Sequence, residues 1–262
     1  MYQEIKIKFS IGVSMLESIA VLIVLGLLLS LSLSAFRPLS GFNVIGNQAR
    51  ELARVEQAIQ KFALIHHRLP CADTTGNGLE GEGGDCGQNT LHQVGAVPYV
   101  TLSLESGTAI GQGVNRNLLY GVYRNNVLGD SACNGQVANR TIKSRDLANH
   151  YKTRDEFRMA VTNAQCAGID ADRLFVTGNG FNTGNTDCNN RVGNMAYLLI
   201  ANGETDADGN GSLFDSVHNS TRWPDGNNQH CFAPPSKKRS YSYDDLVIGK
   251  SFSELLGALT IN

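Results

Sequence analysis

The fold is decided by residues 13–36, VSMLESIAVLIVLGLLLSLSLSAF, an apolar run in which Glu17 is the only charged residue. A helix of this length extends about 36 Å, whereas the apolar core of a bilayer is about 30 Å thick. Lys6 and Lys8 precede the run, and positive charge on that side favours a cytoplasmic amino terminus. The run therefore predicts one membrane-spanning helix, with the rest of the chain on the outer side.

A simple membrane anchor has no use for Glu17. A charge near the centre of an inserted helix costs about 2.5–3.5 kcal/mol, so its presence suggests a function. A charge at that depth needs a partner of opposite sign. Residues 13–36 contain no Lys, Arg or His. The partner must therefore come from another chain, or from an amino terminus that cleavage creates.

The segment around Glu17 resembles the signal of type IV prepilins. It reads Lys6-x-Lys8-Phe9-Ser10-Ile11-Gly12, then Val13-Ser14-Met15-Leu16-Glu17, and continues into the apolar run. The resemblance implies that a membrane peptidase cuts after Gly12 and that Val13, where phenylalanine is usual, becomes the methylated amino terminus. It also implies that Glu17 is the glutamate typical of the fifth mature position. The amine of Val13 in one subunit would then neutralise Glu17 of its neighbour, since a buried charge is far less costly when paired.

A second helical stretch follows the apolar run. Pro38 is expected to interrupt the helix, because proline removes a backbone donor and clashes with the preceding turn. Apolar residues then recur at three- and four-residue spacing through residues 46–68, GNQARELARVEQAIQKFALIHHR. Residues 37–68 are therefore predicted to form an amphipathic continuation of the helix, with a solvated charged face.

From Leu69 onward the sequence is polar and rich in glycine, which predicts a globular domain over residues 69–262. Two capping boxes, Thr153–Glu156 and Ser251–Glu254, each predict the start of a helix. Short apolar runs separated by turn residues predict the strands of an antiparallel sheet, at 94–104, 118–123, 173–178, 195–202 and 246–252.

The predicted fold class is α+β. A long N-terminal helix, with a membrane half and an amphipathic half, would pack on a small antiparallel sheet with large disulfide-braced loops. Parts of the outer domain, RLPCADTTGNGLE, VGAVPYVTLSL and YDDLVIGKSFSELLGAL, resemble the outer domains of prepilin-type proteins. The resemblance thus implies a pilin-like arrangement.

All six cysteines follow the apolar run, on the predicted outer side. Their even number and their placement predict disulfides in an oxidising compartment, although six cysteines allow 15 pairings. A sequential pairing is expected, namely Cys71 with Cys86, Cys133 with Cys166, and Cys188 with Cys231.

The stretch DADGNG, residues 206–211, fits the first half of a calcium-binding loop. Asp206, Asp208 and Asn210 place side-chain oxygens at alternate positions, and glycine stands sixth. The twelfth position, where an acidic ligand is expected, holds Val217, so Asp215 is the candidate replacement. The alternative is an exposed turn, which Asp, Asn and Gly also favour. Calcium is the one cofactor that the sequence suggests.

Other function classes find little support in the sequence. A net charge of -2 excludes a generally basic nucleic-acid binder, and Lys237–Arg239 is interpreted as an exposed loop. The chain contains no GxSxG, HExxH or phosphate-binding glycine loop, so no enzymatic activity is expected. Asp73, Asn77 and Glu80 are interpreted as a turn instead of a second calcium site.

The resemblance implies a minor pilin or a pseudopilin, a structural subunit of a type IV pilus or of a type II secretion pseudopilus. Residues 1–12 would be the leader, and residues 13–36 the assembly helix. Expected partners are other such subunits, prepilin peptidase, the inner-membrane assembly platform and membrane lipid, with nucleic acid not expected. The expected location is the bacterial inner membrane, single-pass with a periplasmic outer domain, and then the filament. A membrane-anchored periplasmic enzyme and a surface adhesin are the alternatives.

Overall fold

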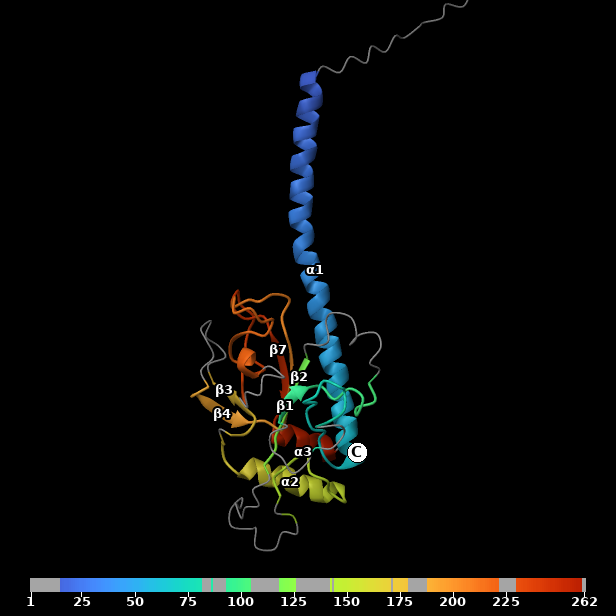
Figure 1. The fold of residues 1–262 in the computed structure, drawn as a ribbon, viewed down its shortest axis with the longest axis vertical. Coiled ribbons are helices and arrows are strands. Elements are labelled where there is room, and N and C mark those ends of the chain that lie inside the picture. Colours follow the sequence, from blue (N-terminus) through green and yellow to red (C-terminus); the bar gives the residue numbers. More distant parts are fainter. Residues whose placement is uncertain are drawn as a thin grey trace, which may run out of the picture. The chain divides into compact units, whose positions relative to one another are not determined.

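The computed structural model describes residues 15–81, 86, 93–104, 118–125, 142, 144–170, 172–178, 188–221 and 230–260. These residues form an α+β fold with four helices and two sheets (Figure 1). The chain divides into two compact units, Met1–Gly46 and Asn47–Asn262. The second unit holds both sheets.

Helix α1 spans Met15–His66 and passes through Pro38 without a break, where the sequence predicted an interruption. From Asn47 onward the helix belongs to the second unit, and its apolar face is buried there. Leu52, Val55 and Ile59 are each 0% exposed and recur at three- and four-residue spacing. The amphipathic pattern predicted for this part of the helix is therefore confirmed.

The predicted membrane half of the helix is contradicted. In the part of the chain that the structure describes, no helix is both long enough and apolar enough to cross a membrane. The predicted single-pass location in a bacterial inner membrane, with a periplasmic outer domain, is corrected by the same finding.

The larger sheet has four antiparallel strands in the order β1-β2-β5-β7. Its strands are β1 (Val94–Ala96), β2 (Leu118–Val122), β5 (Tyr197–Ala201) and β7 (Leu246–Lys250). Successive residues of β5 point to opposite faces, so Leu199 joins the core under α1 while Leu198 joins a second core. Both faces of this sheet are therefore covered, which explains why β2 and β5 are buried throughout.

The second core lies against a smaller sheet, of which the sequence predicted only the strand at 173–178. Its strands are β3 (Phe175–Thr177), β4 (Arg191–Asn194) and β6 (Cys231–Phe232), in the order β4-β3-β6. Strand β3 is antiparallel to β4 but parallel to β6. The expectation of one small antiparallel sheet is therefore wrong. The sequence signal was weak because β4 is partly exposed and β6 has only two residues.

Both capping boxes are confirmed. Helix α2 (Arg154–Cys166) follows the N-cap Thr153, whose side chain accepts from the N–H of Glu156 at 3.2 Å. Helix α3 (Phe252–Thr260) follows Ser251, whose N–H donates to Glu254 Oε2 at 2.8 Å. The two helices lie side by side in Figure 1, and a short 3-10 helix, η3, spans Ser216–Thr221.

Candidate functional site

The residues of the predicted processing site lie outside the described part of the chain. Gly12 and Val13 precede Met15, where the description begins. Glu17 lies on α1, but its side chain is also outside the described part. Cleavage after Gly12, methylation of Val13 and the pairing role of Glu17 therefore stay predictions.

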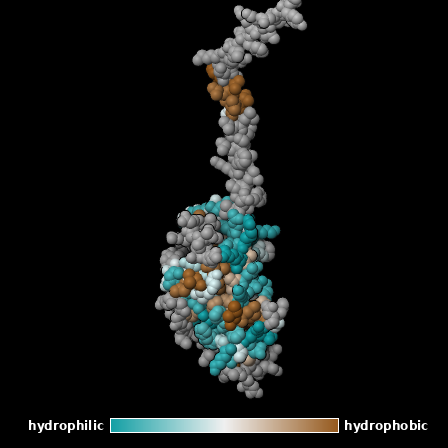
Figure 2. Space-filling model, turned by 90° about the vertical axis from the view of Figure 1, so that its right-hand side faces the viewer, coloured by the Kyte–Doolittle hydropathy of each residue, from teal (hydrophilic) through white to brown (hydrophobic). Residues whose placement is uncertain are grey.

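Next to Glu17, the first unit carries a continuous set of exposed apolar side chains. Ile19 and Val21–Leu25 are each between 49% and 68% exposed. Figure 2 shows this segment as a brown band on the helix. Apolar exposure of this extent on a helix points to a contact surface.

Two of the three predicted disulfides are present. Cys71 is joined to Cys86, and Cys188 to Cys231. The third prediction pairs Cys166, at the end of α2, with Cys133, which lies outside the described residues. That pairing therefore stays a prediction, although no cysteine in the described ranges is free.

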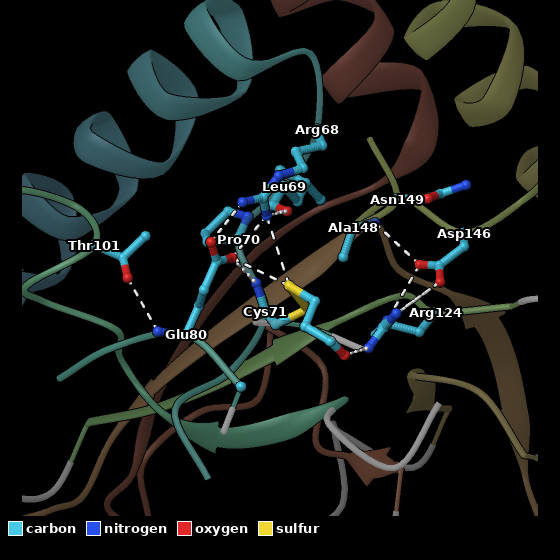
Figure 3. Close-up of a disulfide and its surroundings, with 12 residues drawn as sticks. Arg68, Leu69, Pro70, Cys71, Glu80, Thr101, Arg124, Asp146, Ala148 and Asn149 are labelled. Carbon is cyan, nitrogen blue, oxygen red and sulfur yellow. Dashed lines mark hydrogen bonds and ion pairs between the residues drawn. A yellow bond between two sulfur atoms is a disulfide. The ribbon is translucent and has the colours of Figure 1, made fainter. Parts of the chain in front are cut away.

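The Cys71–Cys86 disulfide lies between two buried ion pairs (Figure 3). On one side, Arg68 makes a two-pronged contact with Glu80, including Nη1–Oε2 at 2.7 Å. On the other side, Arg124 Nη2 lies 2.9 Å from Asp146 Oδ2, and Arg124 Nη1 donates to the carbonyl of Cys86 at 2.8 Å. Both arginines therefore contact the disulfide loop.

The predicted calcium ligands come together in the second unit. Asp206, Asp208 and Asp215 each place one carboxylate oxygen within 4.8 Å of the others. Asp215 is 0% exposed, and its Oδ1 accepts from the backbone N–H groups of Ala207, at 3.0 Å, and Asp208, at 3.3 Å. Asp215 therefore lies close enough to Asp206 and Asp208 to serve as a ligand in place of an acidic residue at the twelfth position.

Asn210 fits the cluster less well than the three aspartates. Its Nδ2 donates to Asp208 Oδ2 at 2.6 Å, and its Oδ1 accepts from the N–H of Ser212 at 2.8 Å. The N–H groups of Asn210 and Gly211 both donate to Asp206, as in an ordinary Asp/Asn/Gly turn. The loop therefore combines the turn geometry with gathered carboxylates.

Two further aspartates, which the sequence did not indicate, lie beside Asp215. Asp244 and Asp245, which follow the buried Tyr243, share with Asp215 a second group of oxygens that all lie within 4.8 Å of one another. Asp245 Oδ2 lies 2.6 Å from Nδ1 of His218, and both side chains are fully buried. The adjacent pair of aspartates before the β7 run was a usable sequence signal, but nothing in the spacing linked it to residues 206–215.

His218 connects Asp245 to the backbone of Ala233. Its Nε2 accepts from the backbone N–H of Ala233 at 3.1 Å, so the ring proton must be on Nδ1, which faces Asp245. The histidine therefore donates to one carboxylate of the cluster.

The electrostatics of the cluster favour a cation. The pKa of Asp215 is raised from 3.8 to about 7, first by burial and also by the neighbouring carboxylates of Asp245 and Asp244. Oδ1 of Asp244 is buried and has no hydrogen-bond partner. It lies directly against Gly203, where a side chain of any size would collide with it. Carboxylate oxygens are the ligands that calcium prefers, so the donor set fits this ion.

The residues of the looser set, Asp73, Asn77 and Glu80, are engaged elsewhere. Asp73 accepts from the N–H groups of Thr75, Gly76 and Gly78, at 2.6–2.9 Å. Glu80 is paired with Arg68. The interpretation of this stretch as a turn therefore agrees with the structure.

No protein-family model matches this chain, and neither does a curated protein or a solved structure.

Proposed function

We propose that this chain is a structural subunit of a filament of the type IV pilin or pseudopilin kind, with no catalytic role. Copies would assemble by packing the first half of α1 against the same segment of other copies. The prepilin-like sequence around Gly12 and Glu17 supports this proposal.

The observation that carries the proposal is the exposure of five consecutive apolar residues, Val21–Leu25. Successive residues of an α-helix are rotated by about 100°, so five in a row point to every side of the helix. A partner on one side would leave several of them in water, at a cost of about 1.5–3 kcal/mol for each large side chain not buried. A bundle with neighbours all around would cover the segment, and a filament core provides such neighbours.

The proposal includes processing of the amino terminus. Prepilin peptidase would cleave after Gly12, and the new amine of Val13 would pair with Glu17 of an adjacent copy. In the dry centre of a bundle this pairing would set how far one helix is shifted along the next, because an unpaired buried charge is costly.

The test compares a charged substitution in the apolar segment with a charged substitution elsewhere on the same helix. Val24→Asp should abolish filaments of the full-length chain, as seen by electron microscopy and by sedimentation. Lys61→Asp, on the exposed face of the later half of α1, is the matched control and should leave assembly largely intact. Wild-type assembly by Val24→Asp would contradict the proposal.

Calcium binding at residues 206–215 is the second proposal. Two clusters of three aspartates each, which have the buried Asp215 in common, favour calcium binding. The Oδ1 atom of Asp244, which has no hydrogen-bond partner, also favours it. The ion would act structurally, by joining the loop 206–215 to Asp244 and Asp245. Calorimetric titration of the full-length chain with calcium tests this proposal, and a titration without heat or saturation would contradict it.

A further inference from the structure

Two interactions, a disulfide and an ion pair, join the two sides of the loop that contains Cys71 and Cys86. The disulfide joins residues 15 positions apart, and the Arg68–Glu80 ion pair joins residues 12 positions apart over an overlapping stretch. All four side chains are buried, with at most 9% of any of these residues exposed. The ion pair therefore makes a non-covalent closure of the segment that the disulfide closes covalently.

Glu80 contacts both cysteines. Its Oε2 accepts from the backbone N–H of Cys71 at 3.1 Å and lies 3.2 Å from Sγ of Cys86 (Figure 3). Arg68 Nη1, which also contacts this oxygen, lies 3.6 Å from the same sulfur atom. The N–H of Glu80 donates to Thr101 Oγ1 at 3.0 Å, which ties Glu80 to a neighbouring loop.

We propose that Glu80 is the positioning residue for the pairing of Cys71 with Cys86. In the reduced chain the Arg68–Glu80 pair would bring the two thiols together, and so would select this disulfide from the alternatives that six cysteines allow. The physical basis is the entropy of loop closure, since an ion pair that has already closed the loop leaves little further ordering for the disulfide to achieve. Charge-assisted, two-pronged contacts of this kind are among the strongest hydrogen bonds between side chains.

The covalent step is ordinary thiol–disulfide exchange, with oxidised glutathione as the oxidant. One cysteine thiolate attacks glutathione disulfide, which forms a mixed disulfide and releases one glutathione thiolate. The second cysteine thiolate then attacks the protein sulfur of the mixed disulfide and releases the second glutathione. Two protein thiols are oxidised, one glutathione disulfide is reduced to two thiols, and the two thiol protons pass to the released glutathiones. Glu80 takes part by position and transfers no atom.

The second disulfide provides an internal comparison. Cys231 lies in a cluster with Phe175, Val217, Ala233 and Tyr243, against which Cys188 packs. This cluster includes neither Arg68 nor Glu80, the two charged residues that lie against Sγ of Cys86. A change at Glu80 should therefore alter one disulfide selectively.

The experiment equilibrates the full-length chain in glutathione buffers of graded redox ratio, traps free thiols by alkylation, and maps each cysteine by mass spectrometry. Glu80→Gln should lower the equilibrium constant for forming Cys71–Cys86 about tenfold. The constant for Cys188–Cys231 should change less than about twofold, because its neighbours are untouched. Arg68→Lys, which keeps the charge but loses the planar fork, should lower the same constant in the same direction.

Leu199→Ala is the control for general destabilisation, since this core residue lies in β5 and is fully buried. It should lower both constants by a similar factor. The proposal is overturned if Glu80→Gln leaves the Cys71–Cys86 constant unchanged, or if it lowers both constants equally, as Leu199→Ala does. If Glu80→Gln fails to fold and loses both disulfides, the result counts as an equal lowering of both constants and overturns the proposal.

Discussion

The backbone N–H of Asp244 donates to Oδ2 of Asp215 over 2.7 Å, and this bond joins two loops that are 29 residues apart in sequence. A second bond runs in parallel, from the N–H of Asp215 to Oδ2 of Asp245 at 3.0 Å. The two loops are therefore held together by buried carboxylates. Such carboxylates repel one another unless a proton or a cation lies between them.

The first prediction concerns calcium and the stability of the second unit. Calcium bound only to the folded chain should raise its free energy of unfolding by about 2.7 kcal/mol at one hundred times the dissociation constant. The melting temperature should therefore be higher in millimolar calcium than in chelator. Magnesium should substitute poorly, because it requires a tighter octahedron.

Asp208→Ala should abolish the effect of calcium, because it removes one ligand of the Asp206, Asp208 and Asp215 group. Asp155→Ala is the matched control, since the Asp155 side chain is 81% exposed on α2, far in sequence from the cluster. It should keep the full response. Identical melting curves in calcium and in chelator would leave residues 206–211 as an ordinary turn.

The second prediction concerns pH in the presence of chelator. The pKa of Asp215 is raised from 3.8 to about 7, so between these values the folded chain holds a proton that the unfolded chain has released. The contribution of Asp215 to stability should therefore fall as pH rises from about 4 to 7, and should level off above 7. Calcium favours the ionised carboxylate, so it should reduce or reverse this slope.

The measurement is the melting temperature across this pH range for the wild type and for Asp215→Asn. The falling component should be present in the wild type and absent from the variant, whose side chain does not titrate. Parallel profiles for the two proteins would show that the carboxyl group of Asp215 does not titrate in this window.

The third prediction uses two strand glycines. A Cβ at Gly95, in β1, would lie 2.4 Å from the backbone carbonyl oxygen of Asp73, whereas a Cβ at Gly193, in β4, would meet nothing within 4 Å. Gly95→Ala must push the two backbones apart, against the hydrogen bonds that join Asp73 and Ala96 in both directions. Overpacking of this kind costs about 1–3 kcal/mol. Denaturant unfolding should show this loss for Gly95→Ala and less than about 0.5 kcal/mol for Gly193→Ala.

Local signals in the sequence predicted individual elements well. The box from Thr153 to Glu156 marks the start of α2, because capping depends only on residues three positions apart. Apolar runs likewise predicted β2, β5 and β7, of which β2 and β5 are buried throughout. The smaller sheet escaped prediction because β6 joins β3 across more than fifty residues, and two residues carry no periodicity.

At the candidate cation site, too, the local part could be predicted from the sequence and the long-range part could not. Asp206 and Asp208 were identifiable because they alternate within one short loop. Asp244 and Asp245 were not, because their place beside Asp215 depends on how β7 enters the larger sheet. The predicted membrane half of α1 rested on the length and the apolar composition of residues 13–36, and the finding that no helix in the described ranges can cross a membrane contradicts it.

The fourth prediction concerns processing. The sequence before Val13 resembles a prepilin leader, so the mature chain should begin at Val13 in cells that contain prepilin peptidase. Intact-mass analysis of the purified protein should show the loss of residues 1–12, with or without one methyl group. An intact Met1 in a peptidase-positive strain would contradict cleavage, and Gly12→Val should give such a chain if the glycine is required.

The last prediction concerns Glu17 and follows from the proposed filament. Glu17→Ala should leave cleavage after Gly12 largely intact, because the bond that is cut lies five residues earlier in the chain. It should impair incorporation into filaments, because each buried Val13 amine would then lack its carboxylate, and breaking such a pair costs about 3–5 kcal/mol. Glu51→Ala is the matched control, since this glutamate lies on the later half of α1, where it contacts Arg54 at 3.8 Å. Quantitative blotting of sheared filaments against total protein measures incorporation. Equal incorporation of Glu17→Ala and the wild type would contradict the pairing while leaving the apolar packing of α1 open to the Val24→Asp test.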